Sequence, residues 1–362
     1  MPDKDTNAFG IWRKFRRNPM SVVALGWIVL VAIVALTGPF IRPDQTPNAN
    51  DQELSISRQK PGYSTMVFAV CASSKNSDIS VWEMWRKGGR EKACREYPAD
   101  SLAFSGNSLQ LFKRGEIVTE LGPEEHGLES GSDLAEISED RWYRKQFLLG
   151  TDRFGRDVLS RLMAGSAISL GVGCIAVVIS LLLGTILGAF AGYYGGRTDA
   201  VIMWFINVIW SVPTLLLVIA ITFAFGKGMW KVFLAVGLTM WVEVARVVRG
   251  QFMSVSRMEF VEAARALGYS DVRIMFRHIL PNIMGPVVVI AAANFASAIL
   301  VEAGLSFLGI GAQIPVPSWG NMIKEHYALI TTDLAYLAFL PGVCIMMLVL
   351  SFMLVGDGLK SD

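Results

Sequence analysis

Charged residues are scarce in this sequence. Asp, Glu, Lys and Arg together make up 18% of the 362 residues, whereas hydrophobic residues make up 52%. Soluble domains typically carry about 25% charged residues, so this composition predicts a polytopic membrane protein. The formal net charge is only +2. So mild a charge argues against a nucleic-acid-binding protein.

The residue types used for metal binding and catalysis are few and dispersed. The histidines and cysteines form no C-x-x-C pair and no ligand-like spacing; they are His126, His278, His326, Cys71, Cys94, Cys174 and Cys344. The sequence also lacks the G-x-x-x-x-G-K-[ST] segment that binds ATP phosphates. We therefore expect no catalytic residue, metal or cofactor on this chain, and no ATP hydrolysis by it.

Long apolar runs divide the chain into six predicted membrane helices, because each run can cross much or all of a bilayer. The runs are 20–41, 162–196, 200–226, 232–242, 279–301 and 334–356. The fourth is the weakest, since Glu243, Arg246 and Arg249 follow it directly. A cleaved signal peptide is the alternative for the first run, but about twenty apolar residues exceed a typical signal core.

Basic residues indicate the orientation of these helices. Five lie before the first run, in the segment 1–19, and six lie in or beside the connection between the fourth and fifth runs. The short loops on the other side hold only Lys227, Lys231 and Lys324. Because basic residues stay on the cytoplasmic side, we expect both termini, 1–19 and 359–362, to be cytoplasmic.

A polar segment, 42–148, separates the first predicted helix from the other five. Residues 63–71 and 109–121 read as short β segments, the second with a turn at Arg114-Gly115. Cys71 and Cys94 can form a disulfide if the segment faces an oxidising compartment, although the sequence leaves the pairing open. Between Glu116 and Asp140 there are nine carboxylates and no Lys or Arg, which favours a solvated loop over a docking surface. We predict a small extracytoplasmic insert that contains β-strands.

The loop 255–281 reads as two short helices joined at Gly268. Ser256 with Glu259 is a capping box, and Gly268 stands where a helix C-terminus favours a left-handed residue. The apolar face of the first helix is Phe260, Ala263, Ala264 and Leu267. Ser270 is the expected cap of the second helix, whose apolar face is Val272, Met275, Phe276 and Ile279. Pro281 disfavours helical geometry at Leu280 and begins the next apolar run. On this pattern alone, an ordinary amphipathic connector at the membrane surface is the simplest interpretation.

The residue identities in this loop indicate a more specific role. Glu262-Ala263-Ala264, Gly268 and Leu280-Pro281 resemble the EAA loop of ATP-binding-cassette (ABC) import permeases, with His278 as one departure from the family pattern. The segment 150–157 reads G-T-D-R-F-G-R-D and, as a plain structural turn, would use Asp152 to cap a short interfacial helix. It resembles the segment before the second membrane helix in C-type permease subunits of dipeptide, oligopeptide and nickel importers. Residues 302–309 and 317–320 resemble another signature of the same subunits, and the three matches come in the family's order.

The resemblance implies an all-α polytopic fold with six transmembrane helices, like type I ABC importer permeases, whose core is 149–358. It also implies a bacterial-type inner membrane, a homologous second permease subunit, two cytoplasmic ATPases that bind ATP and Mg²⁺, and an extracytoplasmic solute-binding protein. The ATPase-coupling residues would be Phe260, Glu262, Ala263, Ala264, Leu267, Gly268, Leu280 and Pro281. The signature residues are Gly150, Thr151, Asp152, Gly155, Arg156, Asp157, Ser306, Phe307, Gly309, Pro317, Trp319 and Gly320. The implied function is inward peptide transport by alternating access, with nickel or another solute as the alternative cargo.

Polar residues inside the predicted helices are candidates for the transport pathway. They are Asn207, Asn294, Ser297 and Glu302, although Asn and Ser also often bond a neighbouring helix. An ion-gradient-driven secondary transporter is the alternative function, but it would need more charge within the spans. A membrane-anchored interaction protein that works through the insert is a third.

Overall fold

The computed structural model describes residues 15–359 except 72–79, 93, 106–107, 114, 123–140, 227 and 314. Several predictions lie outside the described residues: most of the basic N-terminal segment, the C-terminal tail from residue 360, Arg114, and most of the acidic stretch 116–140.

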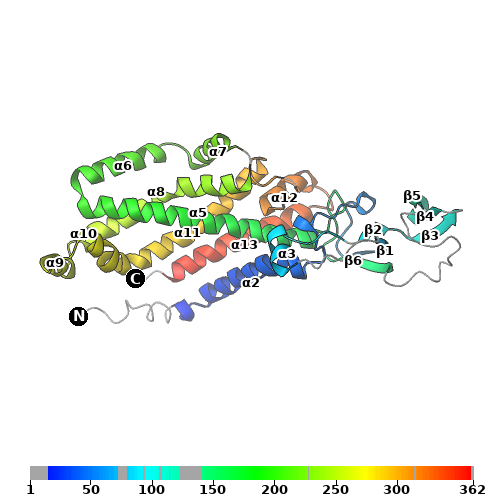
Figure 1. Cartoon of the computed structure of the whole chain (residues 1–362), viewed down its shortest axis with the longest axis horizontal. Helices are drawn as coiled ribbons and strands as arrows, with labels where there is room; N and C mark the ends of the chain where they lie inside the picture. The colour runs from blue at the N-terminus through cyan, green and yellow to red at the C-terminus, as the bar shows by residue number, and fades with distance from the viewer. Residues whose placement is uncertain are drawn as a thin grey trace.

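Long helices run side by side through most of the molecule (Figure 1). Asn18 begins the first of them, because its side chain accepts hydrogen bonds from the backbone N–H groups of Met20 and Ser21. The long helices are α2 (Pro19–Ile41), α5 (Val158–Tyr194), α6 (Gly196–Trp210), α7 (Thr214–Phe225), α8 (Met229–Val255), α11 (Met284–Phe307) and α13 (Tyr336–Gly358). The described residues also include the short α-helices α3 (Val81–Lys87), α9 (Glu259–Ala266), α10 (Asp271–Arg273) and α12 (Trp319–His326).

Within the described residues, four helical segments are long and apolar enough to cross a membrane, and a fifth is formed if α6 and α7 make one broken span. These two helices meet at an angle of 91°, so the third predicted span is bent at Ser211–Pro213. The 27-residue α8 is not among the four, because Glu243, Arg246 and Arg249 interrupt its apolar sequence. Length and composition therefore support four or five spans, where the sequence predicts six.

Glycines on one side of α5 allow α8 to pack directly against it. A Cβ atom at Gly188 would lie 2.5 Å from the backbone oxygen of Ala245, and one at Gly192 would lie 2.5 Å from that of Arg249. At Gly184 the nearest atom would be Val244 Cβ, also at 2.5 Å. Small residues let helix backbones approach closely in a membrane, where the hydrophobic effect gives little attraction.

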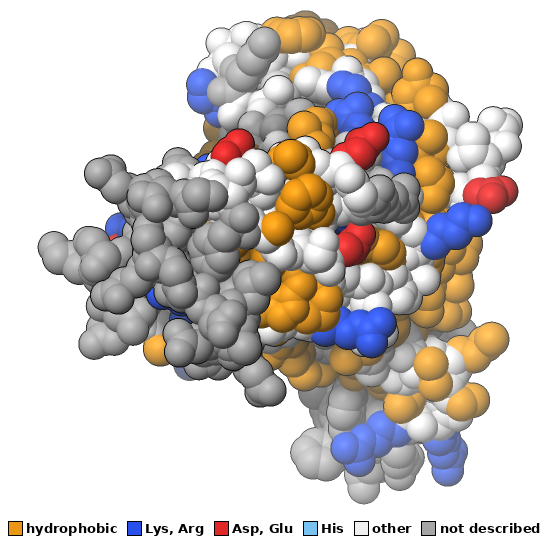
Figure 2. Space-filling view, turned by 90° about the vertical axis from the view of Figure 1, so that its right-hand side faces the viewer, with side chains coloured by type: hydrophobic (Ala, Val, Ile, Leu, Met, Phe, Trp, Pro, Cys, Tyr) orange, Lys and Arg blue, Asp and Glu red, His pale blue; other side chains and the backbone are white. Residues whose placement is uncertain are grey.

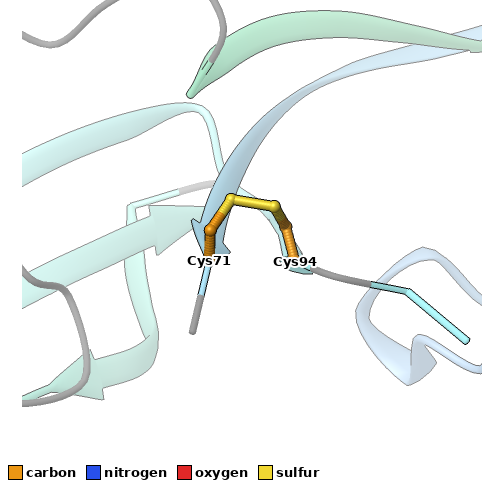
Figure 3. The surroundings of a disulfide bond; sticks show 2 residues. All are labelled: Cys71 and Cys94. Atoms are coloured by element: carbon orange, nitrogen blue, oxygen red, sulfur yellow. A yellow bond between two sulfur atoms is a disulfide. The ribbon is translucent and has the colours of Figure 1, made fainter. Parts of the chain in front are cut away.

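Among its described residues, the insert after α2 contains two antiparallel three-stranded sheets. One has the order β2 (Cys94–Pro98), β1 (Tyr63–Cys71), β6 (Trp142–Phe147). The other has the order β3 (Ser101–Ser105), β4 (Ser108–Lys113), β5 (Glu116–Leu121). The strands β1, β4 and β5 lie where the sequence predicts them. Cys71 pairs with Cys94 across β1 and β2, and the two form a disulfide (Figure 3).

The insert and the loop containing α9 lie at opposite ends of the helix bundle (Figure 1). The start of α2 and the end of α13 lie at the same end as α9, and Ser21 Oγ donates a hydrogen bond to the backbone oxygen of Leu354. At the opposite end, acidic and basic side chains lie between hydrophobic ones (Figure 2). The bundle thus separates two chemically different regions, a helical loop and a disulfide-bonded β domain.

Candidate functional site

The helix α9 ends at Gly268 in a complete Schellman motif. Gly268 has a φ of +77°. Its N–H donates to the oxygen of Arg265 at 3.0 Å, and the N–H of Tyr269 donates to that of Ala264 at 3.2 Å. Only glycine adopts this left-handed conformation at little cost, which is why the predicted helix end is correct. The predicted start is wrong: Ser256 ends α8 instead of capping α9, which begins at Glu259 with no side-chain cap.

One face of α9 is open to solvent and the other packs on the chain itself. Phe260 is 39% exposed and Leu267 is 74% exposed, and Glu262 and Ala263 are also exposed. Ala264, predicted to lie on this open face, is instead buried together with Val261. The reason is that Ala264 borders the inward stripe of α9, where it joins a core cluster with Ile274 and Met275.

The second half of the loop is helical but irregular. After α10, the backbone makes a π-helical turn at Ile274–Ile279 and a 3₁₀ turn at Leu280–Ile283. A π turn is wider than an α turn and rotates the side chains, so Val272 and Phe276 are exposed whereas Ile274 is buried. Of the predicted apolar face, Met275 and Ile279 are therefore buried, whereas Val272 and Phe276 are not.

Leu280 is helical, with φ −53° and ψ −44°, although Pro281 follows it. The helical geometry that Pro281 was predicted to disfavour is therefore present at Leu280. The change from π to 3₁₀ spacing rearranges the backbone hydrogen bonds where Pro281 has no N–H to donate. Leu280 and Pro281 thus lie in one helical segment that continues from α10 into α11.

Polar contacts tie this loop to the rest of the bundle. Tyr193 Oη donates to Asp271 Oδ1 at 2.7 Å and accepts a longer bond from Arg265 Nη2 at 3.4 Å. Arg249 holds Asp199 with two bonds, 2.5 Å from Nε and 2.6 Å from Nη2. The Arg249–Asp199 ion pair is bidentate, which fixes its geometry. It joins α8, which leads into the loop, to α6.

The G-T-D-R-F-G-R-D segment makes a compact turn before α5. Asp152 Oδ1 accepts from the backbone N–H groups of Phe154 at 2.8 Å and Arg156 at 3.0 Å. The helix cap is Asp157, whose Oδ2 accepts from the N–H of Ser160 at 2.8 Å, so the predicted capping role of Asp152 is wrong. Gly155 has a φ of +76°, and a Cβ there would overlap the backbone oxygen of Glu53.

Arg156 joins this turn to α12. The side chain is fully buried and bonds Asp152 Oδ2 and Glu325 Oε2, each at 2.6 Å. His326, beside Glu325, is buried too, and burial lowers the pKa of its imidazole. Asp152, Glu325 and His326 bring their ligand atoms within 4.8 Å of one another. A cation fits poorly among them, because Arg156 already forms ion pairs with both carboxylates and Arg161 Nε, a second positive group, lies 3.7 Å from Asp152 Oδ2.

The second signature also holds elements together. Trp319 Nε1 donates to the backbone oxygen of Leu162 at 2.9 Å. A Cβ at Gly320 would lie 2.5 Å from the oxygen of Ala303. Ser306 Oγ donates to Glu302 at 2.6 Å and accepts from the N–H of Ala312. These contacts pack α12 against α5 and α11. Gly309 has a φ of +83° after α11, Pro317 is buried, and Phe307 is 42% exposed.

Of the pathway candidates, two are internal. Asn294 is fully buried, and its Nδ2 lies 3.3 Å from the oxygen of Met240 and 3.4 Å from Ser180 Oγ. Glu302 is 1% exposed and Ser297 is half-buried. Asn207 is exposed, and its Oδ1 accepts from Arg246 Nη2 at 3.2 Å.

A group around Arg246 is absent from the predicted pathway set. The guanidinium lies 3.4 Å from the centre of the Trp210 ring, which is a cation–π contact at the bend between α6 and α7. Glu243, three residues earlier on α8, is exposed. The signal that could have identified the group is the pair of charges at i and i+3 beside a proline-interrupted helix.

Two family models match parts of this chain. Residues 184–360 match the family model described as a binding-protein-dependent transport system inner membrane component. Residues 10–61 match the N-terminal TM domain of oligopeptide transport permease C.

Curated relatives align over the larger part of their length. The oligopeptide transport system permease protein OppC of Bacillus subtilis is 39% identical over 224 residues, covering 62% of this chain and 71% of the relative. The glutathione transport system permease protein GsiD of Pectobacterium atrosepticum is 40% identical over 212 residues, covering 59% and 70%. Among solved structures, one of the MetNI methionine ABC transporter aligns with a TM-score of 0.45 and 18% identity, covering 55% of this chain and 93% of that one. On the family model and the curated relatives, this chain belongs to the family of binding-protein-dependent transport system inner membrane components, as a C-type permease subunit of an ABC importer.

Proposed function

We propose that this chain is one of two permease subunits of an importer that moves peptides inward by ATP-driven alternating access. The names of the relatives support a peptide cargo, since they include oligopeptide, dipeptide and glutathione permeases. ATP hydrolysis in this family is carried out by separate subunits. The observation that carries the proposal is the open face of α9, at the end of the bundle opposite the insert.

The proposed orientation puts the insert outside and α9 in the cytoplasm of a bacterial-type cell. The Cys71–Cys94 disulfide supports this, because disulfides persist in oxidising compartments and are rare in the cytoplasm. Both chain termini are then cytoplasmic. In this arrangement α8 is the sixth span: its 27 residues give about 40 Å of helix, and it packs along α5, which is itself a candidate span.

The α9 helix is the proposed coupling element. Phe260 and Leu267 would enter an apolar cleft of the ATPase, with Glu262 as a polar anchor and Ala263 allowing close approach. Ala264 would act from the inner side, by fixing α9 on the segment that leads through Leu280 and Pro281 into α11. The importer is completed by a homologous permease, two ATPases that bind ATP and Mg²⁺, and an extracytoplasmic solute-binding protein.

The proposed passage runs beside the bend between α6 and α7. Glu243 lies near the middle of α8, and an exposed carboxylate at membrane depth is stable only beside water or another polar group. Arg246, Asn207 and Trp210 lie at the same bend. Broken helices with polar side chains at mid-membrane are typical of solute passages in transporters. Asn294 and Glu302, being buried, are proposed to hold helices together.

The coupling role is tested by placing a charge on the open face of α9. Leu267→Glu needs no rearrangement of this chain, because the side chain is 74% exposed. The matched control is Leu54→Glu, an equally exposed leucine (71%) in the insert. We expect Leu267→Glu to abolish peptide uptake and ATPase co-purification, and the control to retain both. Normal uptake by Leu267→Glu would reject the assignment.

Cargo is tested separately, by uptake of a dipeptide, an oligopeptide, glutathione and Ni²⁺ into vesicles that contain the whole complex and ATP. Uptake of the peptides alone supports the proposal. Ni²⁺ uptake without peptide uptake would show that the cargo is Ni²⁺ and not peptide, and it would not contradict the proposed coupling role of α9. Uptake by this chain without ATPase subunits, driven by a proton gradient, would instead show a secondary transporter.

A further inference from the structure

The short helix α3 carries an exposed aromatic face. Val81 is 71% exposed, Trp82 is 68% exposed and Trp85 is 44% exposed, and the two indole rings stack with centroids 5.4 Å apart. Spacings of three and four residues place all three side chains on one side of the helix. We call this set, Val81, Trp82 and Trp85, the Trp face. It lies outside the segments that match the two family models, 10–61 and 184–360.

The chain just after α2 holds α3 in place. Arg42 is the first residue beyond α2, and its buried guanidinium donates to the backbone oxygen of Gly88, at the end of α3, and to that of Thr46. The N–H of Arg90 donates to the oxygen of Gln45 at 2.8 Å. A Cβ at Gly89 would lie 2.4 Å from the same oxygen, so the two backbones are in close contact. The position of α3 along the molecule is therefore set by the end of α2.

The length of α2 places its end at the edge of a bilayer that it spans. Its 23 uncharged residues give about 34 Å of helix, slightly more than the hydrocarbon thickness of about 30 Å. Ile33, Leu36 and Ile41 are exposed along this helix, as side chains in contact with lipid would be. Because α3 is held by the residues just after Ile41, Arg42 and Gln45, it lies at the level of the lipid headgroups.

The chemistry of α3 fits that level. Tryptophan is enriched where membrane and water meet, since its ring is largely apolar and its N–H can bond there. Arg86, Lys87 and Arg90 are exposed beside the Trp face and can bind lipid phosphates; Lys87 also pairs with Glu83 at 2.8 Å. A basic helix with one aromatic face is typical of segments that lie in the interfacial plane.

We propose that the Trp face of α3 inserts into the interface of the outer lipid leaflet and anchors the bundle-proximal end of the insert at the membrane surface. The lipid-exposed surface of α2 and the Trp face then form one continuous apolar boundary. A docked protein is the competing occupant, and it would have to cover this surface at the level where lipid already surrounds α2.

The test measures how deep α3 lies in a bilayer. A spin label is placed at Trp82→Cys in full-length protein whose free cysteines, Cys174 and Cys344, are replaced by alanine. In lipid nanodiscs, power saturation compares collisions with oxygen, which partitions into lipid, and with a water-soluble nickel chelate. The matched control is a label at Ile117→Cys on β5, which is 54% exposed and far from α3 in the insert (Figure 1).

We expect the oxygen-to-nickel accessibility ratio at position 82 to exceed that at position 117 by about tenfold. Equal ratios would overturn the proposal. So would a label at position 82 that becomes inaccessible to the nickel chelate only when a solute-binding protein is added. A second measurement keeps Trp82 in place: lipids brominated near the headgroup should quench the fluorescence of the unlabelled protein more than that of Trp82→Phe/Trp85→Phe. Equal fractional quenching of the two proteins would also refute membrane insertion.

Discussion

Replacing Gly188 by alanine should separate α8 from α5. The added Cβ would lie 2.5 Å from the backbone oxygen of Ala245, 2.9 Å from Val248 Cβ and 3.1 Å from Ala245 Cα. Backbone cannot rotate away as a side-chain end can, so the helices must move apart. Overpacking of this kind costs about 1–3 kcal/mol, which equals or exceeds the gain of about 1 kcal/mol from replacing a helical glycine by alanine.

Gly171→Ala on the same helix is the matched control. Its Cβ would meet nothing closer than Phe233 Cε2 at 3.8 Å, an ordinary contact. This variant should therefore gain the helix propensity without a packing cost. Since 1 kcal/mol shifts the melting temperature of a domain this size by about 2–4 °C, we expect the two variants to differ by roughly 5 °C, with Gly188→Ala the lower.

The assay is thermal unfolding of the purified complex in detergent, followed by peptide uptake in vesicles. Gly188→Ala should also transport poorly, because the displaced helix carries Glu243 and Arg246. A Gly188→Ala protein that is as stable as Gly171→Ala would refute the close helix contact.

Three further predictions concern the insert and the signature residues. Cys71→Ser/Cys94→Ser opens a loop with a sequence separation of 23 and should destabilise the insert by about 3 kcal/mol, seen as faster proteolysis there with the helices intact. Burial alone would raise the pKa of Glu96, but Lys145 and Lys92 together hold it below its ordinary value of 4.5. Its stabilisation is thus complete above that value and is lost as the pH falls through the lower pKa. Proteolysis of the insert should accelerate in that range, and less so in Glu96→Gln. Trp319→Phe loses the bond to Leu162 and leaves its carbonyl without that donor, which should cost about 1–3 kcal/mol of stability in thermal unfolding.

The sequence predicted local structure well where one residue type decides it. Gly268 predicted the end of α9, because a positive φ there needs glycine, and alternating apolar residues predicted β1 and the β4–β5 hairpin. The sequence could not decide whether Cys71 pairs with Cys94, because the pairing depends on strand register, which is set between separate segments of the chain.

The failures have a common origin in tertiary contacts. The burial of Ala264 depends on where α9 rests, and the π turn at Ile274–Ile279 changes a periodicity that was assumed to be constant. The 91° bend between α6 and α7 falls within 200–226, which the sequence predicts as a single span. Arg156 shows the same limit, since its partner Glu325 lies 169 positions later in the chain.

The same tertiary contacts explain how a small displacement of α9 can reach the membrane helices. Val261 and Ala264 pack in one cluster with Ile279 and Ile283, which lead into α11, and with Val248 and Phe252 of α8. Packed interiors have few voids and transmit displacement instead of absorbing it. A force on the open face of α9 therefore acts on α8 and α11 together. Because α8 is also locked against the glycines of α5, these helices should move as one rigid body. Rigid-body motion of this kind is what the proposed alternating access would need from the proposed coupling element, α9.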